Sequence, residues 1–264
     1  MSGDAVRQVF PSGPATGLVG VLALLATLHD SVGLDALGWT VGMGCGVALA
    51  VVLAHWLVAA GRRTLLPADR VTLTRAVLVC GVAGLTADAG TVVSGSSGVL
   101  VLLCAVALVL DAVDGQVARR TRTVSPLGAR FDMETDAFLI LVLSIHVARD
   151  LGWWVVGIGA ARYFLLLVRA AGRWMPWLRG QVPPRRWRKA VAAHQGIALT
   201  VATAEVLPAT ASTVAVAAGL VLLVVSFGTE VATLRRQAHE KAVVGTPVAW
   251  PVGPLGEAEV RSLT

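Results

Sequence analysis

The 264-residue chain is 56% hydrophobic and only 14% charged, with a mean hydropathy of +0.75. These values exclude an ordinary soluble globule and a disordered chain, and they are typical of a polytopic membrane protein. The net charge of +6 could indicate a nucleic-acid partner. However, the Lys and Arg residues lie in short connections between apolar runs and form no array with aromatic residues, so we expect no nucleic-acid binding.

Eight apolar runs approach the roughly 20 residues that a membrane span requires. In chain order they lie at residues 15–28, 36–60, 71–88, 97–117, 133–149, 153–171, 190–207 and 211–233. We therefore predict an all-α polytopic membrane protein. The first run is short for a span. It is followed by His29 and Asp30 rather than by a small-residue cleavage site, so we expect a retained helix and not a signal peptide.

The cations are distributed unevenly among the connections. They gather after the second, fourth, sixth and eighth runs, at Arg62, Arg63, Arg70, Arg119, Arg120, Arg122, Arg130, Arg173, Arg179, Arg185, Arg186, Arg188, Lys189, Arg235, Arg236 and Lys241. The other connections carry few charges or mostly acidic ones. By the positive-inside rule, the cation-rich connections and both termini are expected on the cytoplasmic side of the cell membrane.

The chain divides into three parts by composition. The segment GRRTLLPADR at 61–70 separates a two-helix membrane extension (1–61) from the main membrane domain (62–237). Residues 238–264 are predicted to form a flexible cytoplasmic tail, because the sequence from Gly245 onward is rich in Pro and Gly. The three cysteines lie inside apolar runs without ligand or disulfide spacing, so we expect them to be packing residues.

The most informative segment joins the fourth and fifth runs. It fits the pattern D-x-x-D-G-x-x-A-R-x8-G-x-x-x-D-x-x-x-D at all eight fixed positions, which are Asp111, Asp114, Gly115, Ala118, Arg119, Gly128, Asp132 and Asp136. On a helix, the first four of these share one face. Asp132 and Asp136 are one turn apart on the next helix, which places two carboxylate pairs opposite each other if the helices are antiparallel.

These acids lie at the edge of a bilayer and need a compensating positive charge. An acid at the centre of a membrane helix costs roughly 2.5–3.5 kcal/mol, and less near the interface. Carboxylate and water oxygens suit hard divalent cations, so the segment predicts a site for Mg²⁺ or Mn²⁺. Pro126 and Gly128 are expected to break the helix and supply the turn between the two halves of the site.

Two other interpretations of the acids have to be weighed. A single acid near a helix end is often a cap or a snorkelling residue, and Glu134, two residues from Asp132 and from Asp136, is interpreted as ordinary interface polarity. A cluster of intramembrane acids could also belong to a divalent-cation transporter. A transport path would need polar residues towards the far side, whereas the run VLLCAVALVL before Asp111 is apolar.

The motif resembles the signature of the CDP-alcohol phosphatidyltransferases. Upstream, LPADRVTLTR (66–75) resembles the start of the family's first core helix, with Asp69 where the family usually has Asn, and with Thr72 and Arg75 matching. Downstream, RRWRKAVAAHQG (185–196) resembles the basic start of the fifth core helix and aligns Lys189. The resemblance covers about residues 62–235, and it implies a six-helix core preceded by two extra transmembrane helices.

The resemblance also implies a chemistry. Such an enzyme transfers a phosphatidyl group from a CDP-linked lipid, such as CDP-diacylglycerol, to an acceptor alcohol and releases CMP in phospholipid biosynthesis. The implied metal ligands, for two ions, are Asp111, Asp114, Asp132 and Asp136. Asp136 is also the expected general base, and Arg119 is expected to neutralise charge in catalysis. The implied CDP-binding residues are Gly115, Ala118, Arg119, Gly128, Asp69 and Thr72.

The acceptor is the least constrained part of this interpretation. Arg75, Arg162 and Lys189 could form a basic pocket for a phosphorylated polyol such as glycerol 3-phosphate or inositol phosphate. Each could equally be a positive-inside anchor. Arg162 lies about two turns inside a span, where snorkelling is harder, and this favours the phosphorylated acceptor. The expected partners are the lipid bilayer, both substrates and a second copy of the chain in a homodimer.

Overall fold

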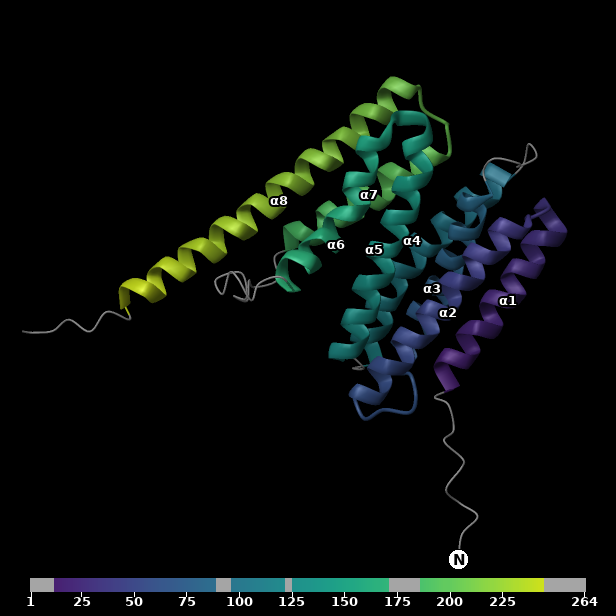
Figure 1. The fold of residues 1–264 in the computed structure, drawn as a ribbon, viewed down its shortest axis with the longest axis horizontal. Coiled ribbons are helices and arrows are strands. Elements are labelled where there is room, and N and C mark those ends of the chain that lie inside the picture. Colours follow the sequence, from purple (N-terminus) through teal and green to yellow (C-terminus); the bar gives the residue numbers. More distant parts are fainter. Residues whose placement is uncertain (1–11, 89–95, 122–124, 171–185, 245–264) are drawn as a thin grey trace, which may run out of the picture.

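The computed structural model describes residues 12–88, 96–121, 125–170 and 186–244. These residues form eight α-helices and one short 3-10 helix, and no strand occurs among them. The elements are α1 (Ser12–Val32), α2 (Ala36–Ala59), α3 (Pro67–Ala87), α4 (Ser96–Thr121), α5 (Pro126–Leu151), η1 (Trp153–Val155), α6 (Val156–Ala170), α7 (Arg186–Thr203) and α8 (Ala209–Val244). Each predicted apolar run overlaps one α-helix, and the run at 153–171 also includes η1 (Figure 1).

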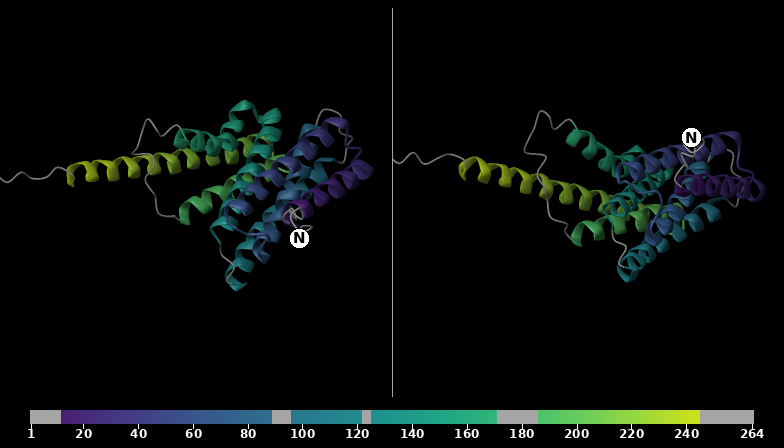
Figure 2. Two further views of the ribbon diagram at one scale, coloured as in Figure 1. Left: turned by 60° about the horizontal axis from the view of Figure 1, so that its bottom comes forward. Right: turned by 90° about the horizontal axis from the view of Figure 1, so that it is seen from below.

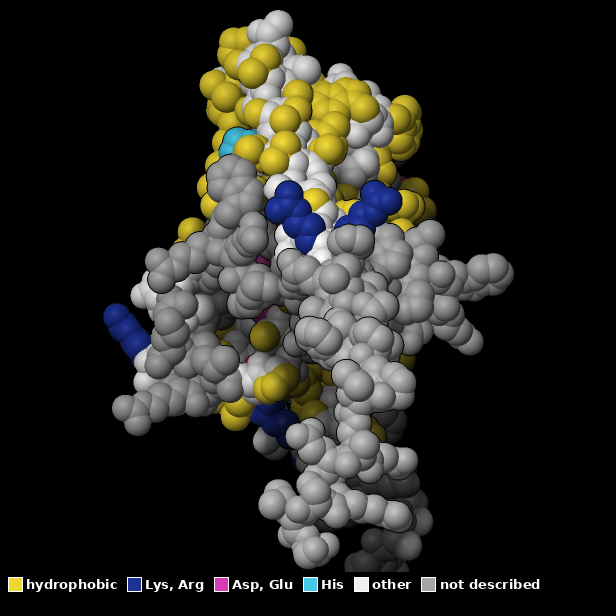
Figure 3. All heavy atoms as spheres, turned by 90° about the vertical axis from the view of Figure 1, so that its left-hand side faces the viewer, with side chains coloured by type: hydrophobic (Ala, Val, Ile, Leu, Met, Phe, Trp, Pro, Cys, Tyr) yellow, Lys and Arg dark blue, Asp and Glu magenta, His cyan; other side chains and the backbone are white. Residues whose placement is uncertain are grey.

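Five helices are long and apolar enough to cross a membrane: α1, α2, α3, residues 97–117 of α4 and residues 209–233 of α8. α1 is longer than its apolar run suggested, because the helix begins at Ser12 and continues to Val32. Large apolar side chains also lie on the outer surface, among them Val58, Phe164, Leu167 and Val214, each about two thirds exposed or more. Figure 3 shows such side chains in yellow over one end of the molecule. An outer surface of this kind is stable only in contact with lipid, so the predicted all-α polytopic membrane fold is confirmed.

Helix α3 is the central element of the N-terminal half. It contacts α1, α2, α4 and α5, and 67% of its most apolar stretch is buried, against 22% for α1 and for α2. A helix that protein surrounds on several sides can carry polar side chains that lipid would not tolerate. Asp69, Thr72 and Arg75 are indeed all buried on α3.

The two N-terminal helices pack closely against α3 through glycines. A Cβ atom on Gly38 of α2 would lie 3.0 Å from the carbonyl oxygen of Gly84 on α3, and one on Gly84 would lie 2.9 Å from the carbonyl oxygen of Gly38. Gly42 of α2 leaves room for Leu25 of α1 in the same way. Between membrane helices, small residues permit the close backbone approach that substitutes for hydrophobic driving force.

The C-terminal half of the bundle contains α5 to α8. α5 packs against α6 and α7, and α7 packs against α8. α8 is 36 residues long and ends at Val244, beyond the predicted end of its apolar run. Figures 1 and 2 show its C-terminal part extending away from the other helices. Residues 238–244 of the predicted flexible tail (238–264) therefore belong to α8, and the rest of that tail, from Gly245, lies outside the described residues.

The start of α5 differs from the predicted turn. The helix begins at Pro126, and Ser125 caps it by accepting a hydrogen bond from the backbone N–H of Gly128 at 2.9 Å. Proline is favoured in the first turn of a helix and serine at its cap. The prediction that Gly128 breaks the helix is therefore wrong, because Gly128 lies inside the first turn of α5.

Candidate active site

Three of the four motif aspartates converge where α4 and α5 meet. Asp111 comes from α4, and Asp132 and Asp136 come from successive turns of α5. Their carboxylate oxygens lie within 4.8 Å of one another, and each side chain is about one third exposed. Oxygen atoms this close together can bind one cation jointly.

Arg75 of α3 reaches into this acid cluster. Its Nη1 lies 3.2 Å from Oδ1 of Asp111 and 2.5 Å from Oδ1 of Asp132, and its Nη2 is paired with Oδ1 of Asp136. The arginine side chain is only 1% exposed. One guanidinium thus joins three helices through charge-assisted hydrogen bonds, which are among the stronger polar contacts in proteins.

The charge of this cluster matches a divalent cation. Three carboxylates contact a single guanidinium here, so these acids outnumber the cation that they share, and a bound divalent ion would offset the excess negative charge. All the donors are carboxylate oxygens, the ligands that Mg²⁺ and Mn²⁺ prefer. Asp111, Asp132 and Asp136 therefore fit a hard divalent ion. The side chain of Asp114, the fourth predicted ligand, lies outside the described part of the chain.

The remaining motif residues are placed in part. Gly115 is half-buried on α4, one turn beyond Asp111. The backbone of α4 continues through Ala118 and Arg119, but their side chains are not among those described. Their predicted roles in nucleotide binding and charge neutralisation therefore stay predictions.

Asp69 and Gly128 meet where α3 crosses α5. The Asp69 side chain is 1% exposed, accepts a hydrogen bond from the backbone N–H of Leu66 at 3.1 Å and pairs with Arg62 at 3.5 Å. A Cβ atom on Gly128 would lie only 2.4 Å from Oδ1 of Asp69. Thr72, one turn along α3, is also buried. The structure thus places three of the predicted CDP-binding residues at the same ends of α3 and α5.

The contact between Gly128 and Asp69 leads to a stability prediction. We expect Gly128→Ala to lower the free energy of unfolding by about 1–3 kcal/mol, a typical cost of overpacking, because Asp69 is held in place by Leu66 and Arg62. Thermal unfolding in detergent measures the effect. Gly44→Ala is the matched control, since a Cβ atom there has nothing within 4 Å. Equal melting temperatures for the two variants would contradict the prediction.

The three predicted acceptor-binding residues are not gathered in one described pocket. Arg75 is bound to the acid cluster. Arg162 of α6 binds Glu134 of α5 with two contacts, Nη2 to Oε1 at 2.6 Å and Nε to Oε2 at 3.3 Å. The side chain of Lys189, near the start of α7, is not described. Acceptor binding by these residues stays a prediction.

Two of these contacts were missed in the sequence. Glu134 lies outside the acid cluster, as expected, but it is the ion-pair partner of Arg162 on α6 rather than ordinary interface polarity. For Arg75, the sequence suggests acceptor binding or a positive-inside anchor, and neither interpretation includes its contact with the acid cluster. The available signal was a cation inside the apolar run 71–88, upstream of four acids in other runs, because charges within membrane helices usually pair with one another.

Comparison with known proteins agrees with this site. The family model of the CDP-alcohol phosphatidyltransferases matches residues 65–227, which is more than half of the chain. The chain belongs to the CDP-alcohol phosphatidyltransferase family. No curated protein and no solved structure matches it.

Family membership establishes the general activity. CDP-alcohol phosphatidyltransferases are membrane enzymes of phospholipid biosynthesis that use a CDP-alcohol donor and an alcohol acceptor, and they generally depend on divalent metals. The match begins two residues before α3 and ends within α8. It therefore includes the acid cluster and Arg75, and it leaves α1 and α2 outside.

Proposed function

We propose that this CDP-alcohol phosphatidyltransferase transfers a phosphatidyl group from a CDP-linked lipid such as CDP-diacylglycerol to a phosphorylated polyol. The observation that carries the proposal is the convergence of Asp111, Asp132 and Asp136 within a family-matched segment. The acceptor oxygen attacks the phosphorus that bears the lipid, the bond from that phosphorus to the CMP oxygen breaks, and CMP leaves.

The site residues have separate roles in metal binding, proton transfer and nucleotide binding. Asp111, Asp114, Asp132 and Asp136 would hold two divalent ions, Mg²⁺ or Mn²⁺, which when bound neutralise charge on the donor diphosphate. Asp136 takes the proton from the acceptor hydroxyl. Arg119, at the end of α4, stabilises negative charge on the leaving nucleotide. Gly115, Ala118, Gly128, Asp69 and Thr72 surround the CDP group.

The position of the active site in the membrane is part of the same proposal. Asp111 lies in the second half of α4 and Asp132 in the first third of α5, so both lie towards the end of the bundle that carries the connection between these helices. That connection is rich in Arg, and the positive-inside rule places it in the cytoplasm. A soluble acceptor and released CMP would then exchange directly with the cytoplasm. We also propose that the enzyme is a homodimer in the cell membrane.

The decisive experiment is CMP release by the purified protein in detergent. CDP-diacylglycerol and Mg²⁺ are supplied with a panel of acceptors that includes glycerol 3-phosphate, inositol phosphate, inositol and serine. Release only with a phosphorylated polyol supports the proposal, and release only with an unphosphorylated alcohol contradicts the acceptor assignment. Uptake of Mn²⁺ by vesicles containing the protein, without CMP release, would instead indicate a transporter.

The acceptor assignment predicts a selective kinetic defect. We expect Arg162→Ala to raise the KM for the phosphorylated acceptor by about tenfold or more, because the variant loses one charge-assisted contact with the acceptor phosphate. The KM for the CDP-lipid should change little. Steady-state kinetics with each substrate varied in turn measures both constants.

Glu134→Gln is the matched control for this prediction. Glu134 competes with the acceptor phosphate for the Arg162 guanidinium, so neutralising it should leave the acceptor KM unchanged or lower it. If both variants instead raise both KM values equally, Arg162 only anchors Glu134 and the acceptor assignment is wrong.

A further inference from the structure

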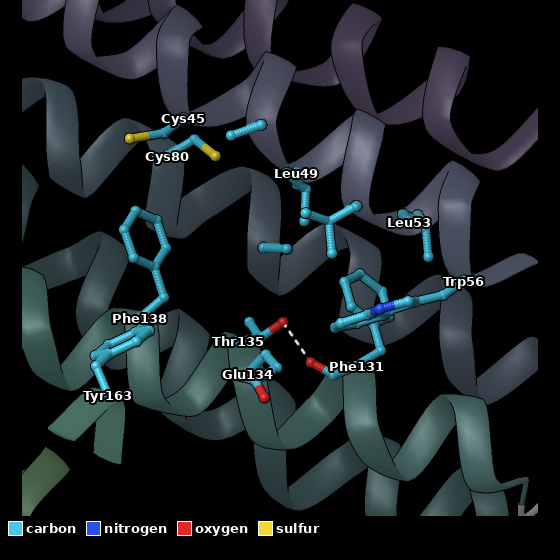
Figure 4. A pocket seen from close by; sticks show the side chains of 13 residues that line it. Cys45, Leu49, Leu53, Trp56, Cys80, Phe131, Glu134, Thr135, Phe138 and Tyr163 are labelled. Atoms are coloured by element: carbon cyan, nitrogen blue, oxygen red, sulfur yellow. Dashed lines mark hydrogen bonds between the residues drawn. The ribbon is translucent and has the colours of Figure 1, made fainter. Parts of the chain in front are cut away.

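A cavity of about 380 Å³ lies between α2, α3, α5 and α6, apart from the acid cluster. One wall is a single face of α2, which contributes Cys45, Leu49, Val52 and Trp56. The opposite wall comes from α5, with Phe131 and Phe138 (Figure 4). The volume of the cavity is within the range of about 300–1,000 Å³ that is typical of small-molecule sites. We propose that this slot binds one hydrocarbon chain of a membrane phospholipid.

The slot exists because α2 follows α3 closely but barely contacts α5. Small side chains, Ala48 on α2 and Ala76 on α3, line the space that remains between them. In Figure 4, Phe131 and Trp56 lie at one end of the slot, and Phe138 and Tyr163 lie together at the other. Ala48 and Val52 are exposed, so this side of the slot is accessible from the surrounding membrane.

The length of the slot fits one leaflet. Cys45 and Trp56 are 11 residues apart on α2, which corresponds to about 16 Å at a rise of 1.5 Å per residue. The hydrocarbon core of a bilayer is about 30 Å thick, so an extended lipid chain in one leaflet occupies about 15 Å. A slot parallel to a membrane-spanning helix and of this length accommodates a single chain lengthwise.

The chemistry of the lining requires an apolar occupant. The hydroxyl of Thr135 is donated to the backbone carbonyl of Phe131 at 2.9 Å, and the carboxylate of Glu134 is bound by Arg162. A water molecule needs two to four polar partners to be stable in a cavity, and these walls are almost entirely hydrocarbon. If the slot were empty, the atoms of its walls would lack van der Waals partners on one side. The lipid chains that surround the protein can enter the slot and supply these contacts.

One end of the slot can also receive a lipid headgroup. The guanidinium carbon of Arg130 lies 4.6 Å from the ring centroid of Trp56, and Arg130 itself is exposed. Trp is enriched at the level of lipid headgroups, and an exposed Arg there binds phosphate oxygens. This pair makes a phospholipid, rather than a neutral hydrocarbon, the occupant that the site favours.

The slot and the acid cluster lie on different faces of α5. Asp132 and Asp136 contact Arg75, whereas Phe131, Thr135 and Phe138 present another face of α5 to the slot. All of α2, and with it the whole α2 wall of the slot, precedes the family match. The bound phospholipid therefore depends on α2, a helix outside the family match, and holds α2 against α5.

Photo-crosslinking tests this proposal. The protein is placed in vesicles of phosphatidylethanolamine and phosphatidylglycerol that contain a phosphatidylethanolamine with a diazirine in one chain, and adducts are mapped by mass spectrometry. We expect adducts on α2 at Leu49 or Val52 and on α5 at Phe138. Ala48→Phe, which fills the slot, should reduce these adducts several-fold. Val47→Phe, a non-lining position on the same helix, should not.

A second pair of variants tests the proposal if Ala48→Phe or Val47→Phe fails to fold. Val52→Trp also narrows the slot from a position that is 42% exposed, and Val51→Trp is its control on the outer face. Equal adduct yields within either folded pair would overturn the proposal. Loss of the adducts on addition of excess CDP-diacylglycerol would also overturn it, because the slot would then belong to the donor.

Discussion

Replacing Asp132 or Asp136 by Asn should reduce kcat for CMP release by about 10²–10³-fold or more, the effect of removing one group that stabilises transition-state charge. The substitution preserves size but removes one of the three converging carboxylates. It should also weaken binding of Mn²⁺, measured by electron paramagnetic resonance in the absence of substrate. Asp150→Asn, at an exposed position near the end of the same helix, is the control and should retain both properties.

The same experiment has clear contrary outcomes. A variant at Asp132 with near-normal turnover would falsify the metal-site hypothesis, and so would unchanged Mn²⁺ affinity. Removal of divalent ions with EDTA should abolish the activity of the unmodified enzyme, and either Mg²⁺ or Mn²⁺ should restore it. Restoration by neither ion would contradict the assignment of hard-ion ligands to this cluster.

Replacing Arg75 by Met should destabilise the protein by about 3 kcal/mol, near the lower limit for breaking a buried ion pair. The lower limit applies because each acid is about one third exposed, although Arg75 is 1% exposed. Without the guanidinium, three carboxylates repel one another where α3, α4 and α5 meet. The measurement is thermal unfolding in detergent with EDTA.

Metal ions should partly reverse this defect. A divalent cation supplies the positive charge that Arg75→Met removes, so we expect Mg²⁺ to raise the melting temperature more in the variant than in the unmodified protein. Arg62→Met is the control, since among the described acids Arg62 pairs with Asp69 alone and is 25% exposed. If Mg²⁺ raised the melting temperature of Arg75→Met and of the unmodified protein equally, Arg75 would not act as the counter-ion of the cluster.

The order and approximate bounds of the helices could be predicted from the sequence because each apolar run becomes one helix. The errors lie at the ends of the helices, where hydropathy alone does not fix the first or last residue. α1 begins at Ser12, before its apolar run, and α5 begins at Pro126 because Ser125 caps it. α8 continues to Val244, through a charged stretch that hydropathy alone assigns to a connection.

The acid cluster could be predicted because its spacing is local. Asp132 and Asp136 are one turn apart on α5. The connection between α4 and α5 is short, so it brings these two residues close to Asp111 of α4. The partners Arg75 and Arg162 could not be assigned in this way. Which acid each arginine meets depends on how α3 and α6 are rotated about their axes against α5, and periodicity within one helix carries no information about that rotation.

The position of Arg75 has a consequence for how the protein is made. Its partners Asp132 and Asp136 lie 57 and 61 residues further along the chain, so at about 5–20 residues per second the arginine precedes them by several seconds. α3 also has the lowest hydropathy of the five candidate spans, and an unpaired Arg near the centre of a helix adds roughly 2.5–3.5 kcal/mol to the cost of insertion. α1 and α2 are already present at that moment, and their glycine faces fit α3. The two helices outside the family match thus give the nascent α3 a protein surface in place of lipid until the acids arrive.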